Sequence, residues 1–162
     1  ERLITASSEA VFGGVYKLAA VEKNGRIIPK IKISENPAKI TLPGVKIPWR
    51  LYDRETGKAI ADVITLGNEK ISSDEPYEIF DPEHTWKRKV VTDFVAKKLQ
   101  VKIFEKGKQV YKSPAVKEIA KYRAEQVDSL WDEVTRFENP HTYYVDLSEE
   151  LWSLRDELLK NH

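Results

Sequence analysis

The sequence predicts an α+β fold, with β-hairpins in the first part of the chain and helices in the last. An Asn-Gly pair at positions 24 and 25 lies between two apolar runs, which is the strongest short-range signal for a β-hairpin. From Pro114 onward, apolar residues recur every three or four positions, the period of one helix face. At 162 residues with 41% hydrophobic content, the chain is long enough to bury a substantial core.

The first hairpin is expected to pair residues 15–22 with residues 26–33. Asn24 and Gly25 both tolerate the positive φ of a type I′ turn, so they form the connection. Pro29 lacks a backbone N–H donor, which places the return strand at a sheet edge or at a bulge.

Further strands follow from apolar runs on either side of turn residues. A short strand is expected at residues 2–5. A second hairpin pairs "IPWRLYD" (47–53) with "KAIADVITL" (58–66), and the apolar alternation of its second strand is only approximate. A third, shorter pairing joins "KLQVKIF" (98–104) to "QVY" (109–111), with a glycine in the turn.

A long helix is predicted after a polar connection at residues 67–86. Ser113 suits the N-cap and Pro114 the first helical position, and Asn139 with Pro140 ends the helix. Its expected buried stripe comprises Val116, Ile119, Ala120, Ala124, Val127, Leu130, Trp131, Val134 and Phe137.

A second helix is predicted in "DLSEELWSLRDELL" (146–159). Asp146 and Glu149 approximate a capping box at its start. Its expected buried side comprises Leu151, Trp152, Leu154, Leu158 and Leu159.

Charge and composition exclude several classes of protein. Twenty-seven Lys and Arg against 26 Asp and Glu leave a net charge of +1, so no global field draws the chain onto nucleic acid or an anionic membrane. No apolar run approaches the roughly 20 residues of a membrane span. The lack of cysteine excludes disulfides and a cysteine nucleophile, and it fits a reducing compartment such as the cytoplasm. Because the chain also has no methionine and opens inside the apolar run "ERLIT", we expect a piece of a longer protein rather than a methionine-poor one.

Lysines on the first hairpin are the one cluster whose spacing indicates ligand chemistry. If the strands alternate, Lys30 and Lys32 share the face opposite Ile31 and Ile33, and Lys17 joins them in a suitable register. Ammonium groups that converge beside a Gly-Gly turn would suit phosphate or diphosphate. A simpler hypothesis stays open, in which these lysines only keep an exposed edge soluble.

Histidines give no comparable signal. His84, His141 and His162 have no second ligand at the spacing of a metal site, so no metal site is expected. The motifs of a phosphate-cradling loop and of a serine nucleophile elbow are also missing from the sequence.

Five stretches, taken in order, resemble the C-terminal third of bacterial nicotinate phosphoribosyltransferases. They are "FGGVYKLAAVE", "PKIKISENPAKITLPG", "RLYDRETGKAIADVI", "DPEHTWKRKVV" and "NPHTYYVDLSEELWSLRDELL". The resemblance implies that residues 1–66 form the end of the family's α/β barrel with associated β-hairpins. It implies a C-terminal domain at residues 67–162, with a β-hairpin and two helices.

The resemblance also implies the chemistry of the full-length enzyme. Members of the family join nicotinate to phosphoribosyl diphosphate with hydrolysis of ATP, giving nicotinate mononucleotide for NAD biosynthesis. Mg²⁺ and ATP are the implied cofactors, and a homodimer through the part of the barrel that this chain lacks is the implied assembly. Lys17, Lys32 and Lys39 are implied as phosphate or diphosphate contacts, because similar positions carry lysines in the related nicotinamide enzyme.

No catalytic residue is carried over to this chain. The family's catalytic histidine and its nicotinate-stacking aromatic have no counterpart here, so the fragment alone is expected to be inactive. Since the base pocket lies elsewhere, the preference between nicotinate and nicotinamide stays open.

A second hypothesis belongs to a different class of protein. In it the chain is a stand-alone interaction module, whose Trp131, Trp152 and "HTYYVDL" segment dock a partner. Both tryptophans also lie on the apolar stripes of the expected helices, where they would belong to an ordinary core. A module should be monomeric and well packed, whereas a piece of a larger enzyme should leave an apolar face uncovered.

Overall fold

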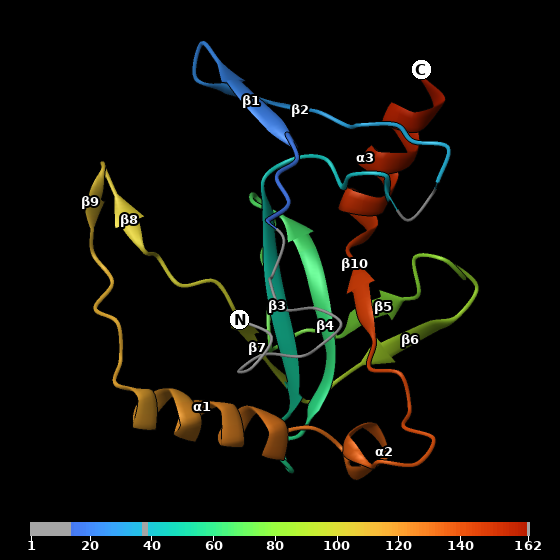
Figure 1. Cartoon of the computed structure of the whole chain (residues 1–162). Helices are drawn as coiled ribbons and strands as arrows, with labels where there is room; N and C mark the ends of the chain where they lie inside the picture. Colours follow the sequence, from blue (N-terminus) through green and yellow to red (C-terminus); the bar gives the residue numbers. More distant parts are fainter. Residues whose placement is uncertain (1–13, 37–38, 162) are drawn as a thin grey trace.

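The fold is organised around a four-stranded mixed sheet. The computed structural model describes residues 14–36 and 39–161, arranged as Figure 1 shows. The sheet consists of β3 (Lys46–Asp53), β4 (Ala59–Leu66), β7 (Phe94–Lys98) and β10 (Val145–Leu147), in the order β10-β4-β3-β7. Strand β10 runs parallel to β4, whereas β3 is antiparallel to both of its neighbours. The expected hairpin of residues 47–53 and 58–66 is confirmed as β3 and β4.

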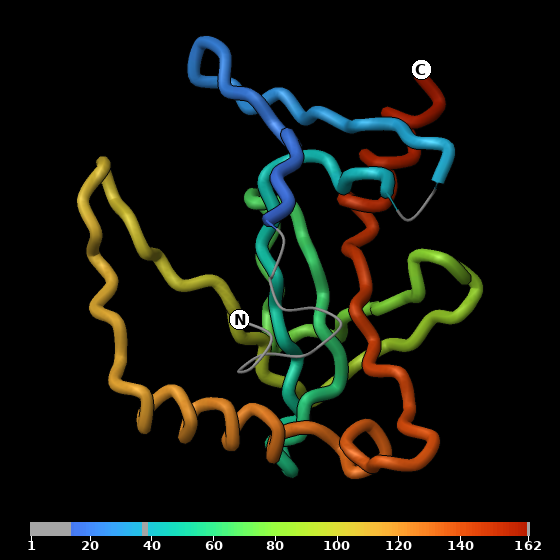
Figure 2. Tube along the Cα trace, viewed as in Figure 1, coloured from blue at the N-terminus to red at the C-terminus, as the bar shows by residue number. Residues whose placement is uncertain are grey.

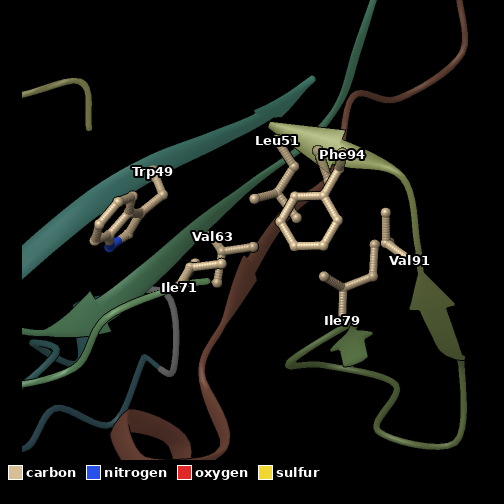
Figure 3. Packing of buried hydrophobic residues seen from close by; sticks show 8 residues of the cluster. Trp49, Leu51, Val63, Ile71, Ile79, Val91 and Phe94 are labelled. Carbon is tan, nitrogen blue, oxygen red and sulfur yellow. The ribbon is translucent and has the colours of Figure 1, made fainter. Parts of the chain in front are cut away.

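One face of this sheet forms the hydrophobic core. Alternate residues of β4 are buried, as a strand with one covered face requires, and these are Ala59, Ala61, Val63 and Thr65. A two-stranded hairpin of β5 (Tyr77–Phe80) and β6 (Arg88–Val91) supplies apolar side chains to the same core. Figure 3 shows Leu51 of β3, Ile79 of β5, Val91 of β6 and Phe94 of β7 converging. The cluster comprises Trp49, Leu51, Ala61, Val63, Ile71, Ile79, Val91 and Phe94.

Strand β5 corrects the expectation for residues 67–86. This segment is not wholly a polar surface connection, because Ile79 and Phe80 are buried within it. The apolar run of β5 is too short to show a period, and the strand is stabilised by pairing with β6 and by the core.

The first hairpin forms, but it is shorter and more exposed than expected. β1 (Ala20–Lys23) pairs with β2 (Arg26–Pro29), and Asn24 and Gly25 adopt φ values of 53° and 72° at the predicted turn. The return strand was expected to reach residue 33, but β2 ends at Pro29, which cannot donate a ladder hydrogen bond. Ile27 and Ile28 are exposed, whereas Ala20, Val21 and Pro29 are half-buried, so the described residues cover the hairpin only in part. The strand expected at residues 2–5 lies outside the described residues.

The predicted long helix is divided in two. α1 (Val116–Asp128) and α2 (Asp132–Thr135) are separated by a turn at residues 129–130 and the extended residue Trp131. The break has a long-range cause. The Ser129 carbonyl accepts a hydrogen bond from the Ala59 amide at 2.7 Å. Lys58 Nζ donates to the carbonyls of Asp128 and Leu130, each at 2.9 Å. These carbonyls hold the start of β4 and so do not continue a helix.

The start of α1 also differs from the expectation. Ser113 is not the cap, because the N-cap residue is Ala115, whose amide donates to the Glu118 carboxylate at 2.7 Å. Glutamate at the third helical position thus satisfies one backbone group at this end.

The last helix, α3 (Glu149–Lys160), lies where the sequence predicts it. Its cap is Ser148, whose hydroxyl accepts from the Leu151 amide at 3.2 Å, whereas Asp146 belongs to β10. Leu151 is fully buried, and the other apolar residues of the expected face are half-buried. In the described part of the chain, no helix combines the length and apolar character that crossing a membrane requires.

An arm extends from one side of the main sheet. It comprises residues 101–128 and contains β8 (Phe104–Glu105), β9 (Lys108–Gln109) and α1. Figure 2 shows the trace leaving the sheet after β7, turning at the β8–β9 hairpin and returning through α1. The third pairing is therefore confirmed in place, although it is only two residues long on each side. The proposed division of the chain after residue 66 stays a prediction, and the main sheet takes strands from both sides of that point.

Candidate functional site

Two of the three predicted phosphate-binding lysines lie side by side. Lys17 Nζ donates to the backbone carbonyl of Lys39 at 3.2 Å, across 22 positions of sequence. Lys32 reaches the same region through its backbone, since its carbonyl accepts from the Thr41 amide at 3.5 Å. All three lysine side chains are exposed, so an anion in solvent can reach each of them.

The strand alternation expected for these lysines is not present. β2 ends before Lys30, and the backbone from there to Ser34 is irregular. Lys17 and Lys39 meet because the chain returns beside itself, with the Gly44 amide donating to the Ala19 carbonyl at 2.8 Å.

The surroundings of the lysines contribute few further donors to an anion. Gly14 is exposed, and a Cβ there would meet nothing within 4 Å, so the backbone makes no close approach at that point. The Thr41 hydroxyl is the buried side-chain polar atom that lacks a hydrogen-bond partner among the described residues. Because it is buried, it does not face an anion held by the exposed lysines. Any anion site here therefore depends on the ammonium groups.

A polar cluster that the sequence did not indicate lies on the other face of the main sheet. Arg50 on β3 and Asp62 on β4 are directly paired in the sheet register. Arg50 Nε and Nη2 donate to the two oxygens of Asp62 at 2.7 and 2.9 Å, a bidentate ion pair. The Tyr143 hydroxyl donates to Asp62 Oδ1 at 2.9 Å, and the Arg50 guanidinium lies 5.6 Å from the Tyr143 ring centre.

This cluster fastens the end of the arm to the sheet. Gln126 near the end of α1 accepts from Arg50 Nη1 at 3.3 Å and from the Tyr52 hydroxyl at 3.4 Å. Burial and the negative charge of Asp62 raise the pKa of Tyr143, while the hydrogen bonds that Arg50 donates to Asp62 raise the pKa of Arg50. Arg50 is paired with Asp62, and the raised pKa values keep Arg50 charged and Tyr143 neutral at pH 7. The cluster therefore has a structural role.

A cavity of about 260 Å³ lies beside β10 and the β5–β6 hairpin. Its lining comprises Ile60, Ile79, Phe80, Asp81, Lys87, Arg88, Lys89, Tyr144 and Asp146. Asp146 is 3% exposed and, among the described residues, its carboxylate has no hydrogen-bond partner. Burial, and then the charge of Asp81, raise its pKa from 3.8 to about 6. Asp81 has the opposite shift, because the Glu83 amide and His84 stabilise its ionised form and lower its pKa.

The histidines and tryptophans have local roles. His84 Nδ1 lies 3.1 Å from Asp81 Oδ2, and the His141 amide donates to the Glu133 carbonyl at 2.7 Å. Within residues 14–36 and 39–161, no three His, Asp or Glu side chains are grouped as a metal site would require. Trp152 packs edge-on against Phe80, with ring centres 6.3 Å apart, as a core residue does.

The fold and these clusters define a class of protein. It is an α+β domain with a one-sided core, whose candidate ligand chemistry is a set of lysines suited to phosphate. In the described part of the chain, no three His, Asp or Glu side chains are grouped as potential metal ligands.

Comparison with known proteins assigns the family. The family model described as "Nicotinate phosphoribosyltransferase C-terminal domain" matches residues 45–155. Nicotinate phosphoribosyltransferase of Bacillus subtilis is 40% identical over 152 residues, which are 94% of this chain and 31% of that protein. The Dictyostelium discoideum enzyme of the same name is 34% identical over 159 residues, 93% of this chain and 26% of that protein. The chain therefore belongs to the nicotinate phosphoribosyltransferase family, and it spans about a third or less of the length of these relatives.

A solved structure supports the fold. The crystal structure of human nicotinic acid phosphoribosyltransferase matches with a TM-score of 0.66 at 24% sequence identity, over 74% of this chain and 24% of that chain. This likeness confirms the mixed α+β fold. The family match and the relatives give no support to the interaction-module hypothesis.

Proposed function

We propose that this chain supplies the C-terminal part of an enzyme that joins nicotinate to phosphoribosyl diphosphate. The products are nicotinate mononucleotide and diphosphate, for NAD biosynthesis, with hydrolysis of ATP. The observation that carries the proposal is the match of residues 45–155 to the family's C-terminal domain. We include in the proposal a cytoplasmic location, Mg²⁺ and ATP as cofactors, and a homodimer. We also include the predicted position of residues 1–66 at the end of the family's barrel, with its associated β-hairpins.

The proposed role of this chain is electrostatic. In the reaction, the ring nitrogen of nicotinate bonds to the anomeric carbon of the ribose while the bond from that carbon to a diphosphate oxygen breaks. Negative charge grows on the departing oxygens, and fixed cations nearby lower the barrier. Lys17 and Lys39 are held together by the hydrogen bond between them, which supports a shared role in contacting phosphate or diphosphate. Lys32 is proposed as a third contact from the neighbouring segment.

Lys17 is prearranged for this role in one respect. Its ammonium group uses a single hydrogen bond, to the Lys39 carbonyl, and an ammonium has three donors. Two N–H groups are thus available for phosphate oxygens without breaking the contact that positions the side chain.

The Lys17→Ala variant tests the site in the enzyme that contains this chain. A hydrogen bond to a charged group contributes about 1.5–3 kcal/mol when enclosed, and the exposure of Lys17 places it at the lower end. We expect the KM for phosphoribosyl diphosphate to rise about tenfold, or turnover to fall by the same factor. The matched control is Lys23→Ala, an exposed lysine at the end of β1 with no hydrogen bond to Lys39. Steady-state kinetics that do not distinguish the two variants would remove Lys17 from the site.

A further inference from the structure

The apolar stripe of α1 faces solvent although its pattern is that of a core helix. Val116 is 81% exposed, Ile119 is 50% exposed, and no residue of the helix is buried. On a helix of 3.6 residues per turn, Val116, Ile119, Ala120, Ala124 and Val127 fall on one face. Lys117, Lys121 and Glu125 lie away from that face, so the helix has a separate side for water.

The rest of the arm is equally uncovered. Every residue from 101 to 125 is exposed except Tyr111. Phe104 is 64% exposed and Val101 is 62% exposed, both at the entry to the β8–β9 hairpin. Apolar surface of this extent along one segment marks a site of interaction.

The arm is anchored to the main sheet at the end of α1. Gln126 contacts Arg50 and Tyr52, and the Asp128 carbonyl accepts from Lys58 Nζ. Between residues 116 and 125, the described hydrogen bonds and ion pairs of α1 stay within the arm. A helix of 13 residues is only marginally stable in water without tertiary packing, so α1 needs a cover that residues 14–36 and 39–161 do not supply.

We propose that the apolar face of α1 docks onto the part of the enzyme that precedes this chain in its relatives. This proposal rests on the proposed function, because it takes that preceding segment as present in the working protein. The Bacillus subtilis relative has about two thirds of its length outside the 31% that matches this chain, and the matched family domain, which includes the arm, is the C-terminal one. A covalently linked segment docks intramolecularly, at an effective concentration that a second copy of the protein does not match.

Arg123 specifies the chemistry of the docking surface. It lies between Ile119 and Val127 in angular position on the helix, and its guanidinium has no partner among the described residues. A charge that becomes buried in an apolar contact must be paired. The partner surface is therefore apolar and carries a carboxylate opposite Arg123.

Site-specific thiol labelling tests the docking in the enzyme that includes the preceding segment. The 162 residues contain no cysteine, so a cysteine introduced in the arm is the one thiol in its peptide and is quantified by mass spectrometry after maleimide labelling. Ile119→Cys reports on the apolar face. Lys117→Cys, about 200° around the helix, is the matched control.

We expect Ile119→Cys to label at least about tenfold more slowly than Lys117→Cys, at a ratio that does not change with protein concentration. Arg123→Glu, added to Ile119→Cys, should restore fast labelling because it places a carboxylate opposite a carboxylate. Equal labelling rates of the two single variants would overturn the proposal. Protection that is lost on dilution would also overturn it, because a second copy would then be the cover.

The same preparations separate this proposal from the proposed function. Formation of nicotinate mononucleotide with equal labelling rates would refute the docking and leave the function standing. Protection of Ile119→Cys in a protein that forms no nicotinate mononucleotide would refute the function and leave the docking standing.

Discussion

Replacing Asp146 by asparagine should stabilise the protein at neutral pH. Asp146 is 3% exposed as a whole residue, and it borders the cavity beside β10. Its carboxylate has no hydrogen-bond partner among the described residues and lies in the field of Asp81. Its pKa is about 6 in the folded state against 3.8 ordinarily. A difference of about two pKa units corresponds to about 3 kcal/mol, since each unit is about 1.36 kcal/mol. Asparagine has nearly the same shape and never ionises, so the variant does not incur this cost.

The sign of the effect follows from proton binding. Between pH 4 and 6, the folded state binds more protons at Asp146 than the unfolded state does, so the wild-type free energy of unfolding falls as pH rises through this window. Above about pH 6 the loss is complete and constant. Asp146→Asn should therefore match the wild type near pH 4 and exceed it by up to about 3 kcal/mol at pH 7 to 8.

Urea unfolding at several pH values, followed by tryptophan fluorescence, measures this difference. Asp74→Asn, at an exposed loop position, is the matched control and should leave the curve unchanged. A stability difference between Asp146→Asn and the wild type that is the same at pH 4 and pH 8 would refute the reasoning, because ionisation would then play no part.

Two further predictions concern the main sheet. Asp62→Ala leaves the Arg50 guanidinium without its bidentate partner on a largely buried face, and it should lower the free energy of unfolding by about 2–3 kcal/mol. The control Glu125→Ala removes an exposed ion pair and should change the free energy of unfolding by less than about 0.5 kcal/mol. Leu51→Ala opens a cavity at a fully buried position and should cost about 2–5 kcal/mol in urea unfolding, against little for the exposed Val45→Ala. A loss for Glu125→Ala or Val45→Ala as large as for its counterpart would contradict the assigned packing.

Local signals in the sequence were sufficient for several elements. The Asn24-Gly25 turn was predictable because the residues that adopt positive φ are themselves the signal. The β3–β4 hairpin was predictable from two apolar runs around a glycine turn, and α3 from its leucine spacing.

Long-range contacts account for what the sequence did not reveal. The end of α1 depends on a carbonyl of Ser129 that meets the Ala59 amide, 70 positions earlier in the chain. The pairing of Arg50 with Asp62 depends on strand register, and β5 depends on its partner β6. For the lysines, strand alternation was expected to put Lys30 and Lys32 on one face beside Lys17, and that alternation is absent. Lys39 was added by the family resemblance, and the structure brings the Lys17 ammonium to its backbone carbonyl. Their role in binding phosphate stays a prediction.

Product formation tests most directly whether this chain works as part of a nicotinate phosphoribosyltransferase. The intact mass of the enzyme that contains the chain is verified first. The enzyme is then incubated with nicotinate, phosphoribosyl diphosphate, Mg²⁺ and ATP, and the products are separated by chromatography. A parallel reaction contains nicotinamide in place of nicotinate. We predict that nicotinate mononucleotide and diphosphate appear in equal amounts and that nicotinate reacts faster than nicotinamide. A folded protein of that mass that consumes no phosphoribosyl diphosphate with either base would contradict the account.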